Sequence, residues 1–160
     1  QCECGNFGCL EALASGNAIA KAARKELERG AASDLLKACD GDPSRLTAEM
    51  VAQSAKRGDG VAWKVFDLAA EYIGVGIAGL INLYNPEAVF IGGGVAQAGD
   101  ILFDRVRRTV QTRALKKTAG SVLILPATFG LKSAVMGAVS LILSGVVNLN
   151  FEHNADSAKK

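Results

Sequence analysis

The feature that most constrains the fold is a short apolar run that leads directly into three glycines. Residues 88–91 form a run typical of a strand, residues 92–94 are all glycine, and a helical pattern covers residues 100–112. A second apolar run at residues 122–125 ends at Pro126. Strand, glycine turn, helix and strand are the layout of a parallel α/β unit. The sequence therefore predicts two short parallel strands.

The rest of the chain has the spacing of helices. The predicted helices cover residues 9–16, 18–29 (capped by Asn17), 33–39, 48–56 (capped by Thr47), 61–84 and 132–147. Residues 72–84 carry no charge, which predicts burial on all sides of that helix. Gly74, Gly76 and Gly79 lower helix propensity there, and we expect a neighbouring backbone to pack closely against them.

Residues 133–151 also lack charged side chains, and by length alone they could span a membrane. Serine and asparagine side chains interrupt this run, and no charged flank or second span accompanies it. We therefore expect a helix buried against the sheet. The polar residues 148–160 read as a tail. The predicted organisation is one domain at residues 1–147 followed by this tail.

Three of the four cysteines lie close together near the start, in the pattern CxCGxxGC. Gly5 and Gly8 allow a positive φ, so the backbone can fold back and bring Cys9 to Cys2 and Cys4. Three thiolates at roughly 2.3 Å from one ion suit structural zinc, which takes four ligands. The pattern predicts a metal knuckle whose fourth ligand comes from elsewhere.

The composition and the cysteine spacing argue against several other roles for this chain. Four cysteines could form two disulfides in a secreted protein, but the clustered spacing favours a metal in a reducing cytoplasm. The formal net charge is +2 and aromatic residues make up 6% of the chain, so neither a nucleic-acid surface nor an anionic-membrane surface is expected. The chain starts just before the cysteines, and we expect that residues are missing upstream.

Two stretches together resemble the ROK family of bacterial sugar kinases and sugar-responsive repressors. They are CECGNFGCLEALASG at residues 2–16 and INLYNPEAVFIGGGVAQAG at residues 81–99. The resemblance runs to about Leu143 and covers only the C-terminal half of such a protein. It implies an α/β fold, the C-terminal lobe of a two-lobe actin/hexokinase-type (ribonuclease H-like) protein, with sugar and ATP bound between the lobes.

The resemblance also implies roles for particular residues. Cys2, Cys4 and Cys9 match the three cysteine ligands of a structural Zn²⁺, whose fourth ligand in the family is an upstream histidine. The only histidine here, His153, lies in the tail and is not taken as that ligand. Glu11 matches a glutamate that binds sugar hydroxyls. Without the family, it would read as an acidic residue favoured at a helix N-terminus.

Gly92, Gly93 and Gly94 match the family's turn on the adenosine side of ATP, which binds with Mg²⁺. Exposed backbone lets a nucleotide approach, and the N-terminus of the next helix offers N–H groups. A tight strand-to-helix turn needs glycine with or without a ligand, so the flanking match carries this assignment. Leu131 and Lys132 depart from the small polar pair usual before the family's final helix.

The family's catalytic aspartate and phosphate loops belong to parts of the protein that this chain does not match. Asp34, Asp40, Asp42 and Asp59 do not fit the motif, so no catalytic residue is assigned and the isolated chain is expected to be inactive. A two-stranded sheet with open edges is marginal. We expect the chain to pack against the missing N-terminal lobe or to self-associate, with a dimer as the expected oligomer.

The leading hypothesis is the C-terminal part of a cytoplasmic ATP-dependent sugar kinase, with glucose as the expected hexose. The alternative is the sugar-sensing domain of a ROK repressor, which would bind DNA through an upstream domain. The intact glycine turn favours the kinase, because a repressor has no need to bind ATP. A third reading, a free-standing zinc-knuckle interaction module, is disfavoured because the long uncharged helices need a large partner surface.

Overall fold

The computed structural model describes residues 1–147, so the predicted tail and His153 lie outside the described residues. The helices are α1 (Leu10–Ala14), α2 (Gly16–Glu28), α3 (Leu35–Ala38), α4 (Ala48–Lys56), α5 (Gly60–Tyr84), α6 (Asp100–Arg113), α7 (Lys116–Ala119) and α8 (Ser133–Val147). The strands are β1 (Ala88–Ile91) and β2 (Leu123–Pro126), and the 3₁₀ turns are η1 (Pro43–Arg45), η2 (Val95–Ala98) and η3 (Gly130–Lys132).

Side-chain caps fix where three of these helices begin. The Thr47 hydroxyl accepts a hydrogen bond from the Met50 N–H at 3.2 Å, as predicted for α4, and Asp59 accepts from the Ala62 N–H at 2.8 Å at the start of α5. The predicted cap of α2 is wrong. Ser15 has extended backbone and accepts from the Ala18 N–H, which places Asn17 inside the helix.

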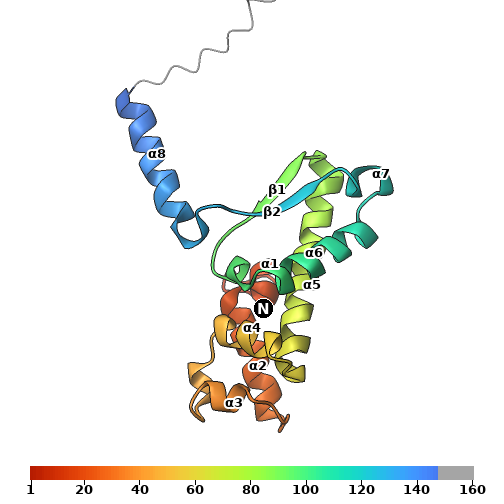
Figure 1. The fold of residues 1–160 in the computed structure, drawn as a ribbon, viewed down its shortest axis with the longest axis vertical. Coiled ribbons are helices and arrows are strands. Elements are labelled where there is room, and N and C mark those ends of the chain that lie inside the picture. Colours follow the sequence, from red (N-terminus) through yellow and green to blue (C-terminus); the bar gives the residue numbers. More distant parts are fainter. Residues whose placement is uncertain (148–160) are drawn as a thin grey trace, which may run out of the picture.

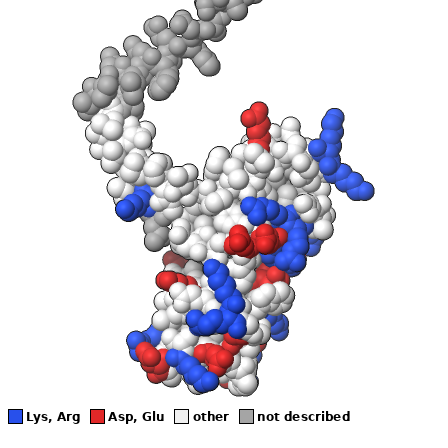
Figure 2. Space-filling model, in the orientation of Figure 1, with Lys and Arg blue, Asp and Glu red and all other residues white. Residues whose placement is uncertain are grey.

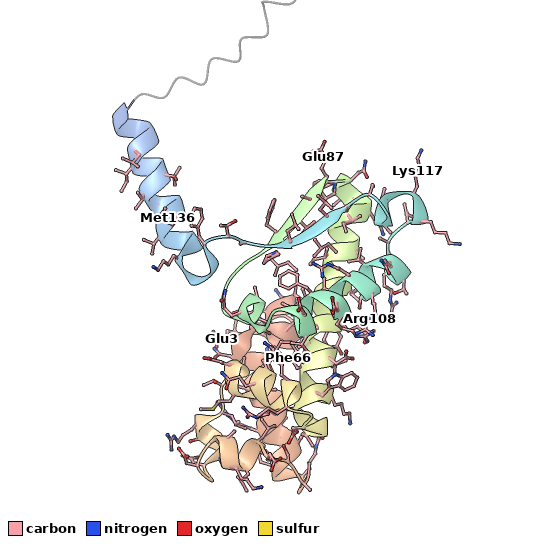
Figure 3. All side chains as sticks on the ribbon, viewed as in Figure 1. Glu3, Phe66, Glu87, Arg108, Lys117 and Met136 are labelled. Atoms are coloured by element: carbon pink, nitrogen blue, oxygen red, sulfur yellow. The ribbon has the colours of Figure 1, made fainter. Side chains whose placement is uncertain are left out.

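Helices α1 to α5 together with α6 form a helical body, with α5 running through it (Figure 1). The core lies where α5 meets α6, α4 and α2. Figure 3 shows Phe66 of α5 inside this body, and it is 1% exposed. Other large side chains buried in the body are Ile19, Leu35, Leu46, Val51, Ile81, Leu102, Val106 and Val110.

The contact between α5 and α6 is close and specific. A Cβ added at Gly74 would lie 2.6 Å from the Cβ of Thr109, so only glycine allows this separation of the two helices. The Arg105 guanidinium of α6 binds two carboxylates of α5, with Nε 3.1 Å from Asp67 and Nη2 2.6 Å from Glu71. The predicted close neighbour is therefore found at Gly74, and it is a threonine side chain. Gly79 has open space around it.

The prediction that residues 72–84 are buried on all sides is wrong. Ile77 and Ile81 are buried, but Leu83 is 72% exposed and Leu80 is also exposed. The neighbouring helices cover only part of the α5 surface, and nothing among the described residues covers the rest. By length and composition α5 could cross a membrane, but in this structure it is the core helix of the body.

The sheet has the predicted parallel pairing. Ala88 lies opposite Leu123 and Ile91 opposite Pro126, and the Ala127 N–H extends the ladder by donating to Ile91 O at 2.9 Å. Ile124 is buried toward the helical body, whereas Phe90 and Leu123 are exposed. Since successive residues of a strand point to opposite faces, one face of the sheet packs on the body and the other is open.

The final helix does not pack against the sheet, which corrects the sequence prediction. Beyond β2 the chain turns through η3 and leads α8 away from the body, as Figure 1 shows and as Met136 marks in Figure 3. Residues 130–147 are therefore called the C-terminal arm. Figure 2 shows charged side chains over the helical body and few on the arm. The arm exposes Val135, Val139 and Ile142. The sequence prediction failed here because an uncharged run favours burial without specifying which surface covers it.

Candidate functional site

The predicted cysteine knuckle is assembled in the structure. The Sγ atoms of Cys2, Cys4 and Cys9 all lie within 4.8 Å of one another, with 3.6 Å between those of Cys4 and Cys9. The Cys2 N–H donates to Asn6 O at 2.8 Å and closes the loop. Gly5 and Gly8, both predicted to turn the chain, have φ values of 90° and 77°.

These distances fit a structural zinc ion. Four ligands placed about 2.3 Å from a tetrahedral Zn²⁺ are separated from each other by about 3.8 Å. Cys2 is buried, Cys9 is partly buried and Cys4 is exposed, so the cluster is open on one side. The chain's single histidine lies outside the described residues, and the fourth ligand is not identified. Zinc at this knuckle stays a prediction.

The thiols of Cys4 and Cys9, the two more accessible cysteines of the knuckle, differ in acidity. The backbone N–H of Asn6, then the side chains of Cys9 and Cys2, hold the pKa of Cys4 below its usual value. The neighbouring Cys4 and Cys2 side chains, with burial, raise the pKa of Cys9. A thiol must lose its proton to bind zinc, so Cys4 is the cysteine of this pair that is readier to do so.

Glu11 lies beside the knuckle in the first turn of α1. Its Oε2 is 3.9 Å from the Cys2 Sγ, and the residue is exposed. The preceding Leu10 rests on α5, with its Cδ2 3.3 Å from the position of a Cβ at Gly76. Glu11 and the cysteines therefore form one unit. The sequence placed them near each other, but only the structure reveals the contact with Cys2.

Gly92, Gly93 and Gly94 lie exposed at the carboxyl end of β1, as predicted. Gly93 has φ +84°, a conformation that other residues rarely adopt. The helix predicted after the turn is confirmed as α6, which begins at Asp100. η2 comes first, held by the buried Ala96 and Ala98. The N-terminus of α6, expected to offer N–H groups to a ligand, begins only after Gly99.

The loops after the two strands meet at one edge of the sheet, because parallel strands end on the same side. Gln97 of η2 reaches the loop after β2, where its Nε2 is 2.8 Å from the position that a Cβ at Gly130 would occupy. Ligands of open α/β sheets bind outside the carboxyl ends of strands. The sequence reading missed Gln97 and Gly130. The available signal in the sequence was a glycine after the second strand, which marks a turn, and in the structure Gly130 has φ +49°.

The four aspartates considered as catalytic candidates have structural partners. Asp59 accepts hydrogen bonds from the Ser33 hydroxyl at 2.8 Å and from two backbone N–H groups. Asp42 caps η1, while Asp34 and Asp40 pair with Lys37 and Arg45. Lys132 of the unusual pair before the last helix lies exposed in η3.

A shallow hollow on the surface of α6 lies away from these sites. It is lined by Asp104, Arg107, Arg108 and Gln111 of α6, and Figure 3 marks Arg108 there. Arg107 pairs with Asp104 and donates to Ile124 O, which ties α6 to β2. We therefore interpret this hollow as part of the packing between α6 and the sheet.

Comparison with known proteins gives a consistent result. The model of the ROK family matches residues 1–144. Glucokinase of Thermotoga maritima is 33% identical over 141 residues, which cover 88% of this chain and 44% of that protein. The chain thus spans less than half the length of that curated relative.

Two solved structures share the fold. A ROK family glucokinase from Streptomyces griseus, in complex with glucose and AMPPNP, has a TM-score of 0.76 and 31% identity, over 86% of this chain and 45% of that one. A ROK family transcriptional regulator, a homologue of the E. coli MLC protein, has a TM-score of 0.75 and 32% identity, over 88% and 34%. The predicted actin/hexokinase-type fold is confirmed.

Proposed function

Because this chain belongs to the ROK family, we propose that it is the C-terminal part of an ATP-dependent sugar kinase that acts on glucose in the cytoplasm. The observation that carries this proposal is the glycine turn. Gly92, Gly93 and Gly94 stay exposed at the carboxyl edge of the sheet, where a nucleotide can reach bare backbone. The similar glucokinase from S. griseus was solved with glucose and AMPPNP.

In this proposal the chain supplies two binding surfaces. Residues 92–94 bind the adenosine part of ATP, and Glu11 accepts hydrogen bonds from sugar hydroxyls. A structural zinc on Cys2, Cys4 and Cys9 holds the loop before α1, and with it the carboxylate of Glu11. Phosphoryl transfer depends mainly on positioning and charge stabilisation, and the base that deprotonates the sugar belongs to the other lobe. The chain alone is then inactive.

The sugar-sensing domain of a ROK repressor is a second candidate. It is favoured by the regulator structure, whose TM-score nearly equals that of the glucokinase. The two readings differ in their ligands. A kinase needs the glycine turn to bind a nucleotide, whereas a repressor needs the sugar surface alone.

Nucleotide binding by this chain therefore tests the proposal. We expect adenosine and AMPPNP to shift amide NMR signals of residues 92–99, and we expect Gly93→Val to abolish the shifts, because valine cannot adopt φ +84° without strain. Gly120→Val is the matched control, since Gly120 has φ −83° and open space around it. Signals shifted by glucose and by neither nucleotide would favour the repressor.

A further inference from the structure

The three cysteines of the knuckle are not equivalent. Cys4 and Cys9 have their Sγ atoms 3.6 Å apart, Cys4 is exposed and Cys9 is partly exposed. Cys2 is buried, and its Sγ is 3.9 Å from the Glu11 carboxylate. One pair of thiols is thus both close together and open to solvent, while the third is enclosed.

We propose that Cys4 and Cys9 form a disulfide when the knuckle loses its metal and meets a peroxide. The Cys4 thiolate attacks one oxygen of hydrogen peroxide, which breaks the O–O bond, forms a sulfenic acid and releases hydroxide. The Cys9 sulfur then attacks the Cys4 sulfur, forms the S–S bond and expels the second oxygen as water. Two thiols are oxidised and one peroxide is reduced to two waters.

The backbone leaves room for this bond. Gly5 and Gly8 turn the loop with positive φ, and nothing lies within 4 Å of a Cβ position at either glycine. The Sγ atoms can therefore approach from 3.6 Å to the bonded distance of about 2.05 Å through a change confined to the loop.

The other thiols are less suited to the reaction. Cys2 is shielded from peroxide, and Cys39 is fully buried in the helical body with its Sγ 3.4 Å from Leu36 O. Reactivity toward peroxide follows exposure as well as thiolate character. Distance and exposure therefore favour the Cys4–Cys9 pair over any pair that includes Cys2 or Cys39.

Disulfide and metal exclude each other, because a sulfur in the S–S bond is no longer a thiolate ligand. Oxidation would leave Cys2 as the only free thiol of the knuckle. It would also reshape the loop that precedes Glu11. The knuckle then acts as a redox-sensitive element next to that carboxylate, whichever ligand the carboxylate binds.

Peptide mapping of this chain tests the proposal. The chain is stripped of metal with EDTA, treated with stoichiometric hydrogen peroxide, denatured, alkylated and cleaved after glutamate. Cleavage after Glu3 and Glu11 places Cys4 and Cys9 in one peptide, residues 4–11, and leaves Cys2 in residues 1–3. We expect peptide 4–11 to be unalkylated and lighter by two hydrogens, with Cys2 and Cys39 alkylated. A link between peptides 1–3 and 4–11, or full alkylation of all cysteines, overturns the proposal.

Variants and zinc complete the test. Cys39→Ser and Cys2→Ser should still form the bond, whereas Cys9→Ser should lose it. Loading the chain with Zn²⁺ should slow the oxidation, and a chromogenic chelator should detect zinc released in step with loss of free thiols. Oxidation at an unchanged rate with zinc, or zinc retained after the bond forms, contradicts the exclusion of metal by disulfide.

Discussion

The helical body and the C-terminal arm are both rich in apolar residues, yet they use them differently. In the body, side chains such as Phe66 and Leu102 are buried between helices. On the arm, Val135 and Ile142 are exposed, and the outer face of the sheet exposes Phe90. Apolar composition gives a residue the tendency to be buried, but stability is gained only where a second surface is present to cover it.

The largest effect expected is a difference between two phenylalanines. Phe66→Ala should lower the free energy of unfolding by about 3–5 kcal/mol, because it leaves a cavity in the core. Phe90→Ala should cost less than about 1 kcal/mol, because Phe90 is 64% exposed. Urea denaturation followed by circular dichroism measures both. Equal losses would mean that a partner surface covers the sheet in solution.

Two glycines of α5 sharpen the comparison within one helix. Gly74→Ala should destabilise the body by about 1–3 kcal/mol, since its methyl group would overlap Thr109. Gly79→Ala, where nothing is close, should stabilise it by about 0.5–1 kcal/mol through helix propensity.

Thr109→Ala in the Gly74→Ala background provides a control. It removes the Thr109 methyl group and hydroxyl, which lie 2.9 and 3.2 Å from the new Cβ, but keeps the Thr109 Cβ at 2.6 Å, so the double variant should recover only part of the lost stability. Strictly additive losses would show that the methyl group and hydroxyl of Thr109 add nothing to the crowding at this position.

The third prediction concerns the cap of α5. Asp59→Ala should cost about 1–2 kcal/mol at neutral pH. Burial tends to raise the pKa of Asp59, but donors from Ala62, Ser33 and Asp34 outweigh it and the pKa is lowered. The stability from the ionised carboxylate is therefore present above the unfolded value of about 3.9, and it is lost as the pH falls through the lower native pKa.

Thermal melts between pH 7 and pH 2 measure this effect. Asp59→Asn should lack the loss of stability at acid pH that protonation of Asp59 causes in the wild type. Thr47→Ala is a matched control, because the hydroxyl of Thr47 that caps α4 is neutral. The idea fails if wild type and Asp59→Asn lose stability in parallel over the acid range.

The smallest effect is expected on the arm. Val139→Ser should change the free energy of unfolding by less than about 0.5 kcal/mol, because Val139 is 41% exposed and lies outside the helical body. The measurement is best made at several protein concentrations. A larger loss that grows with concentration would reveal that the arm is buried in a self-associated form.

The sequence predicted local structure better than it predicted packing. The glycine turn, the parallel strands and the cap at Thr47 follow from short patterns and were found. The cap of α2 was missed because Ser15 and Asn17 are both good caps, and the choice depends on where α1 ends. The position of α8 and the exposed side of α5 could not be predicted, since hydrophobic patterns do not name the covering surface.

The candidate site likewise has parts that the sequence predicts and parts that it does not. The sequence spacing alone predicts that Cys2, Cys4 and Cys9 come together, because two glycines turn one short loop. The contact of Gln97 with the loop after β2 depends on the pairing of two strands far apart in sequence, so no local pattern contains it. The link from Cys2 to Glu11 depends on where α1 rests against α5.

Two segments pack closely on neighbouring glycines of α5, and this has a consequence for how the chain moves. Gly74 receives α6, and two residues later Gly76 receives Leu10, which directly precedes Glu11. One stretch of a 25-residue helix, about 37 Å long, thus serves as the common reference point for the segment that carries Glu11 and for the helix that leads toward the sheet. If two lobes close on a substrate, this half should travel as a rigid unit, with the distance between its two proposed ligand surfaces unchanged.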